Sequence, residues 1–346
     1  MDAVNARWRG FAPVALLSLL AFAGCTDTPP SNRAATSPTP TASAPTLNPT
    51  PTAPPHPVSL QALMQTSFNG RDLRVGRVLA RESSYTRYFV TYRSGDLRIS
   101  GIMNVPAGDG PFPVLILNHG YIDPDIYVNG QGLRREQDYL ARRGFVVLHT
   151  DYRGHASSDD DPNADLRLRL GYAEDVINAI LAVKGSSLPY LDGDRVGLLG
   201  RSMGGGVTYN AAVARPDLID AIVVFAPVSS NAVDNFERWI DGPAERRELA
   251  RRIIAAYGSP QDNPTFWANI SAINFFDRIA VPVIIHHGTA DESVPYDWSE
   301  RTVTALEAAG KDVTFYTYPG EHHAFGPQWP ESMVRTVSFF RRYLRA

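Results

Sequence analysis

The chain has 346 residues, and its 44% hydrophobic content is enough for one large core or two modest ones. A formal net charge of −3 gives no electrostatic reason to expect a nucleic-acid partner. The single cysteine, Cys25, excludes an internal disulfide framework and a metal site built from several thiolates.

The N-terminus has the pattern of an export signal. Two arginines precede the apolar run FAPVALLSLLAFAG (11–24), which is too short to span a bilayer. Two small residues then stand directly before Cys25, in a pattern that resembles the lipobox of bacterial lipoproteins. We therefore predict a signal peptide over 1–24 and a lipid anchor at Cys25 on the outer face of the bacterial cytoplasmic membrane. The alternative is an ordinary secretory signal, which would make the protein secreted.

Residues 25–57 are rich in proline, threonine, serine and alanine and contain almost no bulky apolar side chains. Such a segment cannot bury enough apolar surface to offset the entropy of folding, so we expect a disordered tether. A single catalytic domain is then expected over 58–346, since about 290 residues fit one large α/β domain.

The predicted elements of this domain alternate between strands and helices. RYFVTYRS (87–94) and LRISGIMNVP (97–106) are expected to pair as antiparallel strands around the turn residues Gly95 and Asp96. Six short apolar runs follow, at 113–118, 145–150, 195–200, 221–226, 282–287 and 313–318. Amphipathic helical stretches lie at 131–143, 172–184, 203–214, 297–309 and 331–345.

Near-continuous apolar strands alternating with helices are typical of a parallel sheet that is covered on both faces. The prediction is thus an α/β-hydrolase fold with an eight-stranded, mostly parallel sheet. The segment at about 231–275 separates the sixth and seventh predicted strands, and we expect it to form a small helical lid beside the active site.

The most informative motif is LLGRSMGGG (198–206), which places Ser202 between Gly200 and Gly204 after an apolar strand and at the start of a helix. This is the context of a nucleophile elbow, whose sharp turn leaves no room for side chains at the two glycine positions. Ser202 is the candidate nucleophile. The less specific interpretation is a glycine-rich turn that contains a serine by chance.

A serine nucleophile needs a histidine base that is oriented by a carboxylate. In this fold the three groups follow one another in the order Ser, Asp or Glu, His. Asp291 follows the seventh predicted strand and is the candidate acid, with Glu292 and Asp297 as competitors. His286 and His287 precede the acid, so we interpret both as structural groups at the end of a strand.

An oxyanion hole requires two backbone N–H groups that point at the developing negative charge. The residue after the nucleophile, Met203, provides one candidate donor, and Tyr121 in the loop after the third predicted strand provides the other. His119 in that loop is open to a purely structural interpretation. The loop DYRGHASSD (151–159) is expected to brace the active-site face without a catalytic role.

Five motifs in this order, LNHGY, DYRGHASSD, GRSMGGG, HHGTADESVPY and YPGEHHAF, resemble the catalytic domain of the prolyl oligopeptidase family of serine peptidases. They are also similar to the dienelactone-hydrolase-like and acyl-esterase branches of the α/β-hydrolases. The resemblance covers roughly residues 85–346. It implies acyl transfer through Ser202, with Asp291 and a histidine near the C-terminus. When Gly320 and Phe325 are laid on the family pattern G-x-G-H-x-F, His323 rather than His322 takes the position of the base.

The predicted function is therefore a serine peptidase that hydrolyses peptide or amide bonds of a small substrate. A carboxylesterase for small acyl or carbohydrate esters is the first alternative, and a non-catalytic binding module with a hydrolase fold is the second. No metal or organic cofactor is expected, because the sequence has no metal-ligand spacing such as H-E-x-x-H. Beyond the lipid anchor in the membrane, we expect neither nucleic acid nor an obligate protein partner.

Overall fold

The computed structural model describes residues 54–345, all of which fall in one compact unit. The predicted signal peptide, the lipidation site Cys25 and most of the predicted tether lie outside the described residues. Within the described part, none of the helices has the length and apolar character needed to cross a bilayer.

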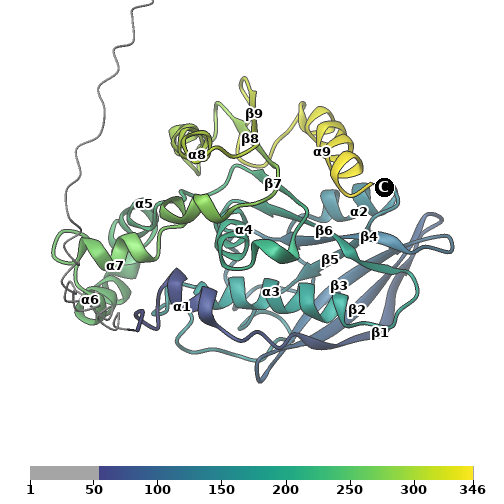
Figure 1. Ribbon diagram of the computed structural model, residues 1–346, viewed down its shortest axis with the longest axis horizontal. Helices are drawn as coiled ribbons and strands as arrows, with labels where there is room; N and C mark the ends of the chain where they lie inside the picture. Colours follow the sequence, from purple (N-terminus) through teal and green to yellow (C-terminus); the bar gives the residue numbers. More distant parts are fainter. Residues whose placement is uncertain (1–53, 346) are drawn as a thin grey trace, which may run out of the picture. The chain divides into compact units, whose positions relative to one another are not determined.

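The core element is a single sheet, which has nine strands in the described part of the chain and the order β1-β2-β3-β5-β4-β6-β7-β8-β9 (Figure 1). The first three strands form an antiparallel meander, and β3 pairs antiparallel with β5. The strands from β5 to β9 in that order run parallel to one another. Their bounds are Arg71–Arg81 (β1), Tyr85–Ser94 (β2), Leu97–Pro106 (β3), Phe112–Asn118 (β4), Val146–Thr150 (β5), Leu191–Arg201 (β6), Ala221–Phe225 (β7), Val283–Gly288 (β8) and Val313–Tyr318 (β9).

The predicted hairpin is confirmed, because Ser94 pairs with Leu97 across a two-residue turn and Gly95 has a φ of 60°. The six predicted parallel strands and five predicted helices are also confirmed, with small shifts at their ends. The predicted number of strands is wrong: the structure has a ninth, β1, at the edge of the sheet. This strand carries four arginines and is mostly exposed, so it lacks the apolar run by which the buried strands are recognised.

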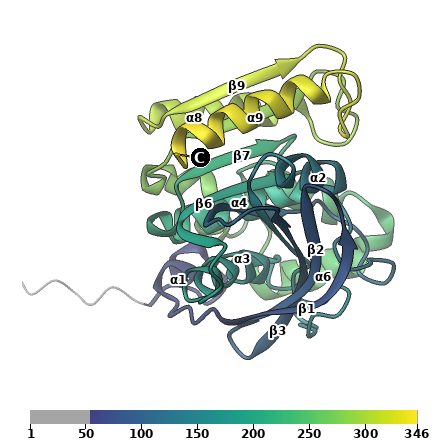
Figure 2. The same ribbon diagram turned by 90° about the vertical axis from the view of Figure 1, so that its right-hand side faces the viewer.

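Helices cover both faces of the sheet (Figure 2). α1 (Leu60–Gln65), α3 (Leu170–Lys184), α4 (Met203–Ala214) and α8 (Tyr296–Ala308) contribute buried residues to the larger hydrophobic cluster on one face. On the other face, α2 (Arg134–Ala141) and α9 (Trp329–Tyr343) pack against a second cluster that includes Phe145 and Phe225. The sheet is thus a doubly covered layer, as its apolar strands require.

The lid lies between β7 and β8 and consists of short helices. Its α-helices are α5 (Ala232–Phe236), α6 (Arg247–Tyr257) and α7 (Pro264–Asn269), with a π-helical turn at Glu237–Asp241 and 3₁₀ segments at Ala244–Arg246 and Ala272–Arg278. His56, from the predicted tether, packs edge-on against Tyr257 and Phe266 of the lid. The end of α6 and the start of α7 are therefore held by a residue close to the beginning of the described chain.

Candidate active site

Ser202 lies in the sharp turn between β6 and α4. Its backbone has φ 56° and ψ −124°, a conformation that is costly for a residue with a side chain and is typical of functional sites. Neighbouring backbone groups hold the turn: the Ser202 N–H donates to the Phe225 carbonyl at 3.0 Å, and its own carbonyl accepts from the Val228 N–H at 3.1 Å. The serine is thus fixed at the carboxyl edge of the parallel strands.

Close packing explains why glycines flank the serine. A Cβ atom on Gly200 would lie 2.3 Å from the Gly204 carbonyl oxygen, and a Cβ atom on Gly204 would lie 1.9 Å from the Asn118 carbonyl oxygen. Both distances are far below van der Waals contact. Side chains at these positions would therefore push α4 away from the sheet.

Asp291 lies in the loop after β8, where its side chain is completely buried and its carboxylate accepts four hydrogen bonds. Oδ1 accepts from the backbone N–H groups of Ser293 and Val294 at 2.8 and 2.9 Å. Oδ2 lies 2.8 Å from His323 Nδ1 and 3.0 Å from His287 Nε2. Burial alone would raise the pKa of Asp291, but the hydrogen bonds from the two histidines outweigh it and hold the pKa well below its usual value. The carboxylate is thus ionised and held in one orientation.

The two adjacent histidines make different contacts. His323 is largely buried, with 19% of its side chain exposed, and it bonds to Asp291. His322 is 71% exposed and lies 3.1 Å from Glu292, a carboxylate that is itself at the surface. Asp297, the other competing acid, forms an ion pair with Arg301 at 3.5 Å. Glu292 accepts a hydrogen bond from the His323 backbone N–H at 3.3 Å, but among the three carboxylates considered only Asp291 bonds to the His323 imidazole.

The structure brings Ser202 to the same edge of the sheet as this pair, because β6, β8 and β9 run parallel and one of the three residues follows each strand within five positions. Among the described residues, no hydrogen bond joins Ser202 Oγ to His323. In free enzymes this hydrogen bond is often long and shortens only in the complex with substrate.

The loop after β4 packs directly against the serine. A Cβ atom on Gly120 would lie 3.1 Å from Ser202 Cβ, so the backbone next to Tyr121 is close to the candidate nucleophile. Met203 is the first residue of α4, where N–H groups have no partner within the helix. The Met203 N–H therefore lies at the positive end of a helix dipole, and Tyr121 directly follows a residue that packs on Ser202.

Buried histidines and carboxylates brace this loop from behind. His119 stacks on Tyr127 and Tyr152 with ring centroids 4.8 and 4.4 Å apart, and burial lowers its pKa to about 3. Asp151 accepts hydrogen bonds from the Tyr127 hydroxyl at 2.8 Å and the Gly130 N–H at 2.8 Å. The neutral His119 and the buried Asp151 thus act as structural supports, in line with the bracing role expected for the 151–159 loop.

A cavity of about 510 Å³ opens beside Ser202 and extends under the lid. Most of its walls are apolar, from α4, the lid and the loop before α3; they include Leu168, Val207, Phe236, Trp239, Trp267 and Ile270. Charged side chains also line it, namely Asp165, Arg169, Glu245 and Arg246. Such a cavity can bury an apolar group of a substrate while its reactive bond lies at the serine.

Sequence reasoning missed two residues of this region. His287, interpreted only as a strand-end group, donates directly to Asp291 and in turn lies 2.7 Å from the Ser299 hydroxyl. Arg169, which no motif includes, contacts both Tyr121 and Met203. The only local signal for the contact between His287 and Asp291 is their spacing of four residues. The contacts of Arg169 with Tyr121 and Met203 depend on the fold and have no local signal. Across residues 54–345, no cluster of three or more histidine, cysteine, aspartate or glutamate side chains has the arrangement of a metal site.

Comparison with known proteins places these features in a family. A model of the prolyl oligopeptidase family matches residues 131–346. The uncharacterized peptidase YtmA of Bacillus subtilis is 24% identical over 253 residues, which are 72% of this chain and 91% of that protein. Dipeptidyl aminopeptidase BIII of Pseudoxanthomonas mexicana is 28% identical over 247 residues, but the match covers only 33% of its length, against 69% of this chain.

Solved structures share the fold at lower identity. The acylaminoacyl peptidase of Pyrococcus horikoshii superposes with a TM-score of 0.58 and 21% identity, over 76% of this chain and 42% of that one. Est1E from Butyrivibrio proteoclasticus, solved with ferulic acid, has a TM-score of 0.58 and 19% identity, over 74% of this chain and 99% of that one. With the family match over most of its length, the chain belongs to the prolyl oligopeptidase family and is a serine hydrolase with the α/β-hydrolase fold.

Proposed function

We propose that the protein is a serine peptidase that cleaves peptide or amide bonds through an acyl-enzyme on Ser202, with His323 as the base and Asp291 as its orienting acid. The observation that carries this proposal is the 2.8 Å contact between His323 Nδ1 and the ionised Asp291, at the same edge of the sheet as Ser202 on its strained turn. The family match and the relatives named as peptidases support the substrate class.

In the proposed reaction, Ser202 Oγ attacks the carbonyl carbon while its proton passes to His323 Nε2. The carbonyl oxygen becomes an oxyanion that accepts hydrogen bonds from the Met203 and Tyr121 N–H groups. The tetrahedral intermediate then releases the amine, which takes the proton from His323. A water molecule then attacks the ester of the acyl-enzyme while His323 takes its proton. His323 returns this proton to Ser202 Oγ, and the carboxylic acid is released.

Because Asp291 is held ionised, it stabilises the imidazolium that forms in both steps. Its bond to Nδ1 also keeps the other ring nitrogen free to take the serine proton. Asp291 thus sets both the orientation and the charge of the base.

Carboxylesterase activity is a second candidate, and one observation favours it. The match spans 99% of Est1E but only 42% of the acylaminoacyl peptidase, so the shared region corresponds to a whole esterase, as it does to 91% of the peptidase YtmA. Esters and amides react by the same chemistry at such a site, and therefore only a comparison of substrates separates the two functions.

The decisive experiment has two parts. First, a fluorophosphonate probe should label the wild type at Ser202 and leave Ser202→Ala unlabelled; no labelling of the wild type would favour a non-catalytic binding module, and equal labelling of both proteins would refute Ser202 as the nucleophile. Second, kcat/KM should be measured for p-nitrophenyl esters beside aminoacyl and prolyl p-nitroanilides. Turnover of the anilides supports the peptidase, whereas ester turnover without amide cleavage leaves only the esterase.

We further propose that Cys25 carries a lipid anchor that attaches the domain to the outer face of the cytoplasmic membrane through the 25–57 tether. The small residues before the only cysteine of the chain support this proposal. The full chain expressed in a bacterial host should incorporate labelled fatty acid and partition into detergent. Cys25→Ser should abolish both, and unchanged labelling of that variant would contradict the anchor.

A further inference from the structure

One arginine contacts both residues whose N–H groups are the proposed oxyanion donors. Arg169 lines the cavity next to Ser202. Its guanidinium carbon lies 4.8 Å from the centroid of the Tyr121 ring, and its Nη1 donates to Met203 Sδ at 3.4 Å. The first contact is a cation–π interaction, and the second is a weak hydrogen bond. Together they tie the loop after β4 to the first turn of α4.

The backbone places this side chain at a cost. Leu168 and Arg169 both adopt the left-handed conformation, with φ of 52° and 58°, although neither is glycine. Two consecutive residues of this kind persist only where the surroundings hold them, and such strain is common at functional sites. In this conformation the Arg169 side chain lines the cavity at the start of α3.

A carboxylate then holds the guanidinium in place. Asp165 Oδ1 accepts from Arg169 Nε at 2.6 Å, four residues earlier in the same turn. Burial alone lowers the pKa of Arg169, but the neighbouring Asp165 outweighs it and raises the pKa above its ordinary value. The side chain is therefore a permanent, oriented cation, with Nε on Asp165 and Nη1 on Met203.

We propose that Arg169 is a positioning residue for the oxyanion hole, which sets the separation of the Tyr121 and Met203 N–H groups and adds a fixed positive charge near the developing oxyanion. This inference rests on the proposed function. Preorganised donors and charges act on the transition state far more than on the bound substrate. Loss of Arg169 therefore lowers kcat and leaves KM nearly unchanged.

A different role for the same residue predicts a different kinetic result. Arg246, in the 3₁₀ segment Ala244–Arg246 of the lid, also lies over the Tyr121 ring, with its guanidinium carbon 5.0 Å from the centroid. If the two arginines instead recognised an anionic group of the substrate, the loss of one would raise KM for charged substrates. A small neutral ester such as p-nitrophenyl acetate carries no such group, so it isolates the effect on the oxyanion.

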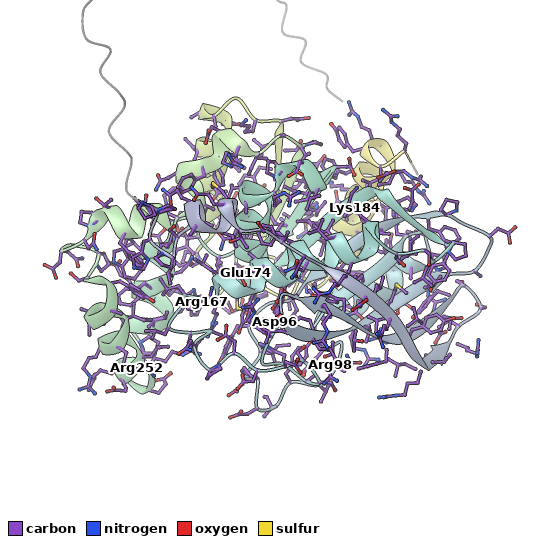
Figure 3. All side chains as sticks on the ribbon, turned by 60° about the horizontal axis from the view of Figure 1, so that its bottom comes forward. Asp96, Arg98, Arg167, Glu174, Lys184 and Arg252 are labelled. Carbon is purple, nitrogen blue, oxygen red and sulfur yellow. The ribbon has the colours of Figure 1, made fainter. Side chains whose placement is uncertain are left out.

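The test compares the full wild-type chain with Arg169→Met, Arg169→Lys and Arg167→Met. Arg167 is a matched control from the same turn, because it does not line the cavity and bonds instead to Glu174 at 3.2 Å; Figure 3 labels both residues. With p-nitrophenyl acetate, Arg169→Met should lower kcat by roughly 10–100-fold, with KM within about twofold, since removal of a whole oxyanion donor costs about 10²–10³. Arg169→Lys should restore part of the loss, because it keeps the charge without the planar fork.

A transition-state analogue provides the second measurement. The inhibition constant of phenylboronic acid, which forms a tetrahedral adduct with the serine, should rise in parallel with the fall in kcat/KM. Thermal unfolding shows whether each variant is folded. If Arg169→Met is not folded, Arg169→Lys decides the question, with an expected loss in kcat of about fivefold or more.

Three outcomes would overturn the inference in an active wild type: unchanged kcat in the Arg169 variants, a rise in KM without a fall in kcat, or an equal loss in Arg167→Met. A wild type that neither hydrolyses the ester nor reacts with the fluorophosphonate would instead refute the proposed function. The two failures are therefore distinguishable.

Discussion

At the scale of single residues, two adjacent histidines differ in burial and therefore in how firmly their contacts are held. His322 and His323 each lie beside a carboxylate, and those carboxylates, Glu292 and Asp291, are also neighbours in the chain. The exposed pair is screened by water and contributes little energy. The buried pair is held by four hydrogen bonds to Asp291, so its geometry is fixed.

This difference predicts the result of two alanine substitutions. His323→Ala should lower kcat/KM for p-nitrophenyl acetate by at least about 10³-fold, because the base is lost. His322→Ala, the matched neighbour, should stay within about twofold of the wild type, because it removes only a surface contact. Loss of turnover in His322→Ala with retained turnover in His323→Ala would show that the assignment of the base is wrong.

A second pair of adjacent histidines tests how Asp291 is held. His287 donates to the Asp291 carboxylate, whereas His286, the preceding residue on β8, bonds to the Tyr318 hydroxyl at 2.8 Å. His287→Leu removes one of the hydrogen bonds that lower the pKa of Asp291, so the carboxylate becomes more basic and binds the imidazolium proton more tightly. We expect kcat/KM to fall about tenfold and the acid limb of its pH profile to move to higher pH.

The controls separate positioning from general stability. His287→Gln keeps a side-chain donor and should restore most of the activity, whereas His286→Gln alters an equally buried neighbour and should leave the acid limb in place. An acid limb that is the same in His287→Leu and in the wild type would mean that His287 only packs.

At the scale of elements, the sequence predicted what depends on local patterns. The hairpin around Gly95 and the buried parallel strands were recognisable because turn residues and apolar runs have short-range causes. The edge strand β1 was missed because its arginines face water and it is held by pairing with β2, which no local pattern records. Contacts such as Arg169 with Met203, 34 residues apart, arise only from the fold.

The lid helix α6 shows the same dependence on burial. Ile253 is fully buried, while its neighbour Arg252 is exposed. Ile253→Ala should lower the free energy of unfolding by about 2–4 kcal/mol, because it leaves a cavity between the lid and the core. Arg252→Ala should change it by less than about 0.5 kcal/mol.

Urea unfolding of the full chain measures both values. A separate early transition in Ile253→Ala would indicate that the lid unfolds independently of the sheet. Equal midpoints for the two variants would contradict the anchoring role of Ile253.

At the scale of the whole molecule, buried histidines make stability depend on pH. Burial lowers the pKa of both His119 and His286 to about 3, from an ordinary value near 6.5. Both are neutral in the folded protein, so below pH 6.5 the unfolded chain binds protons that the folded protein does not. Their contribution to stability is complete above that pH and is lost as the pH falls toward 3.

We therefore expect the free energy of unfolding to be about 4 kcal/mol lower at pH 5 than at pH 7 from these two groups together. Urea titrations at several pH values measure the slope. His286→Gln removes one of these groups and should reduce the difference in the free energy of unfolding between pH 5 and pH 7 by about 2 kcal/mol, even though it also lowers the stability at neutral pH. If the free energy of unfolding of His286→Gln changed with pH as much as that of the wild type, His286 would not be a source of the pH dependence.

The two histidine–carboxylate pairs that follow β9 also form an internal comparison within one chain. The same two chemical groups meet once at the surface and once in the interior, one residue apart on each loop. In a proton NMR spectrum the Nδ1–H of His323, which is protected from solvent, should give a sharp low-field resonance. The Nδ1–H of His322 should exchange with water and broaden beyond detection. The chain thus carries its own reference for what exclusion of solvent does to an imidazole–carboxylate hydrogen bond, measurable in one sample at one temperature.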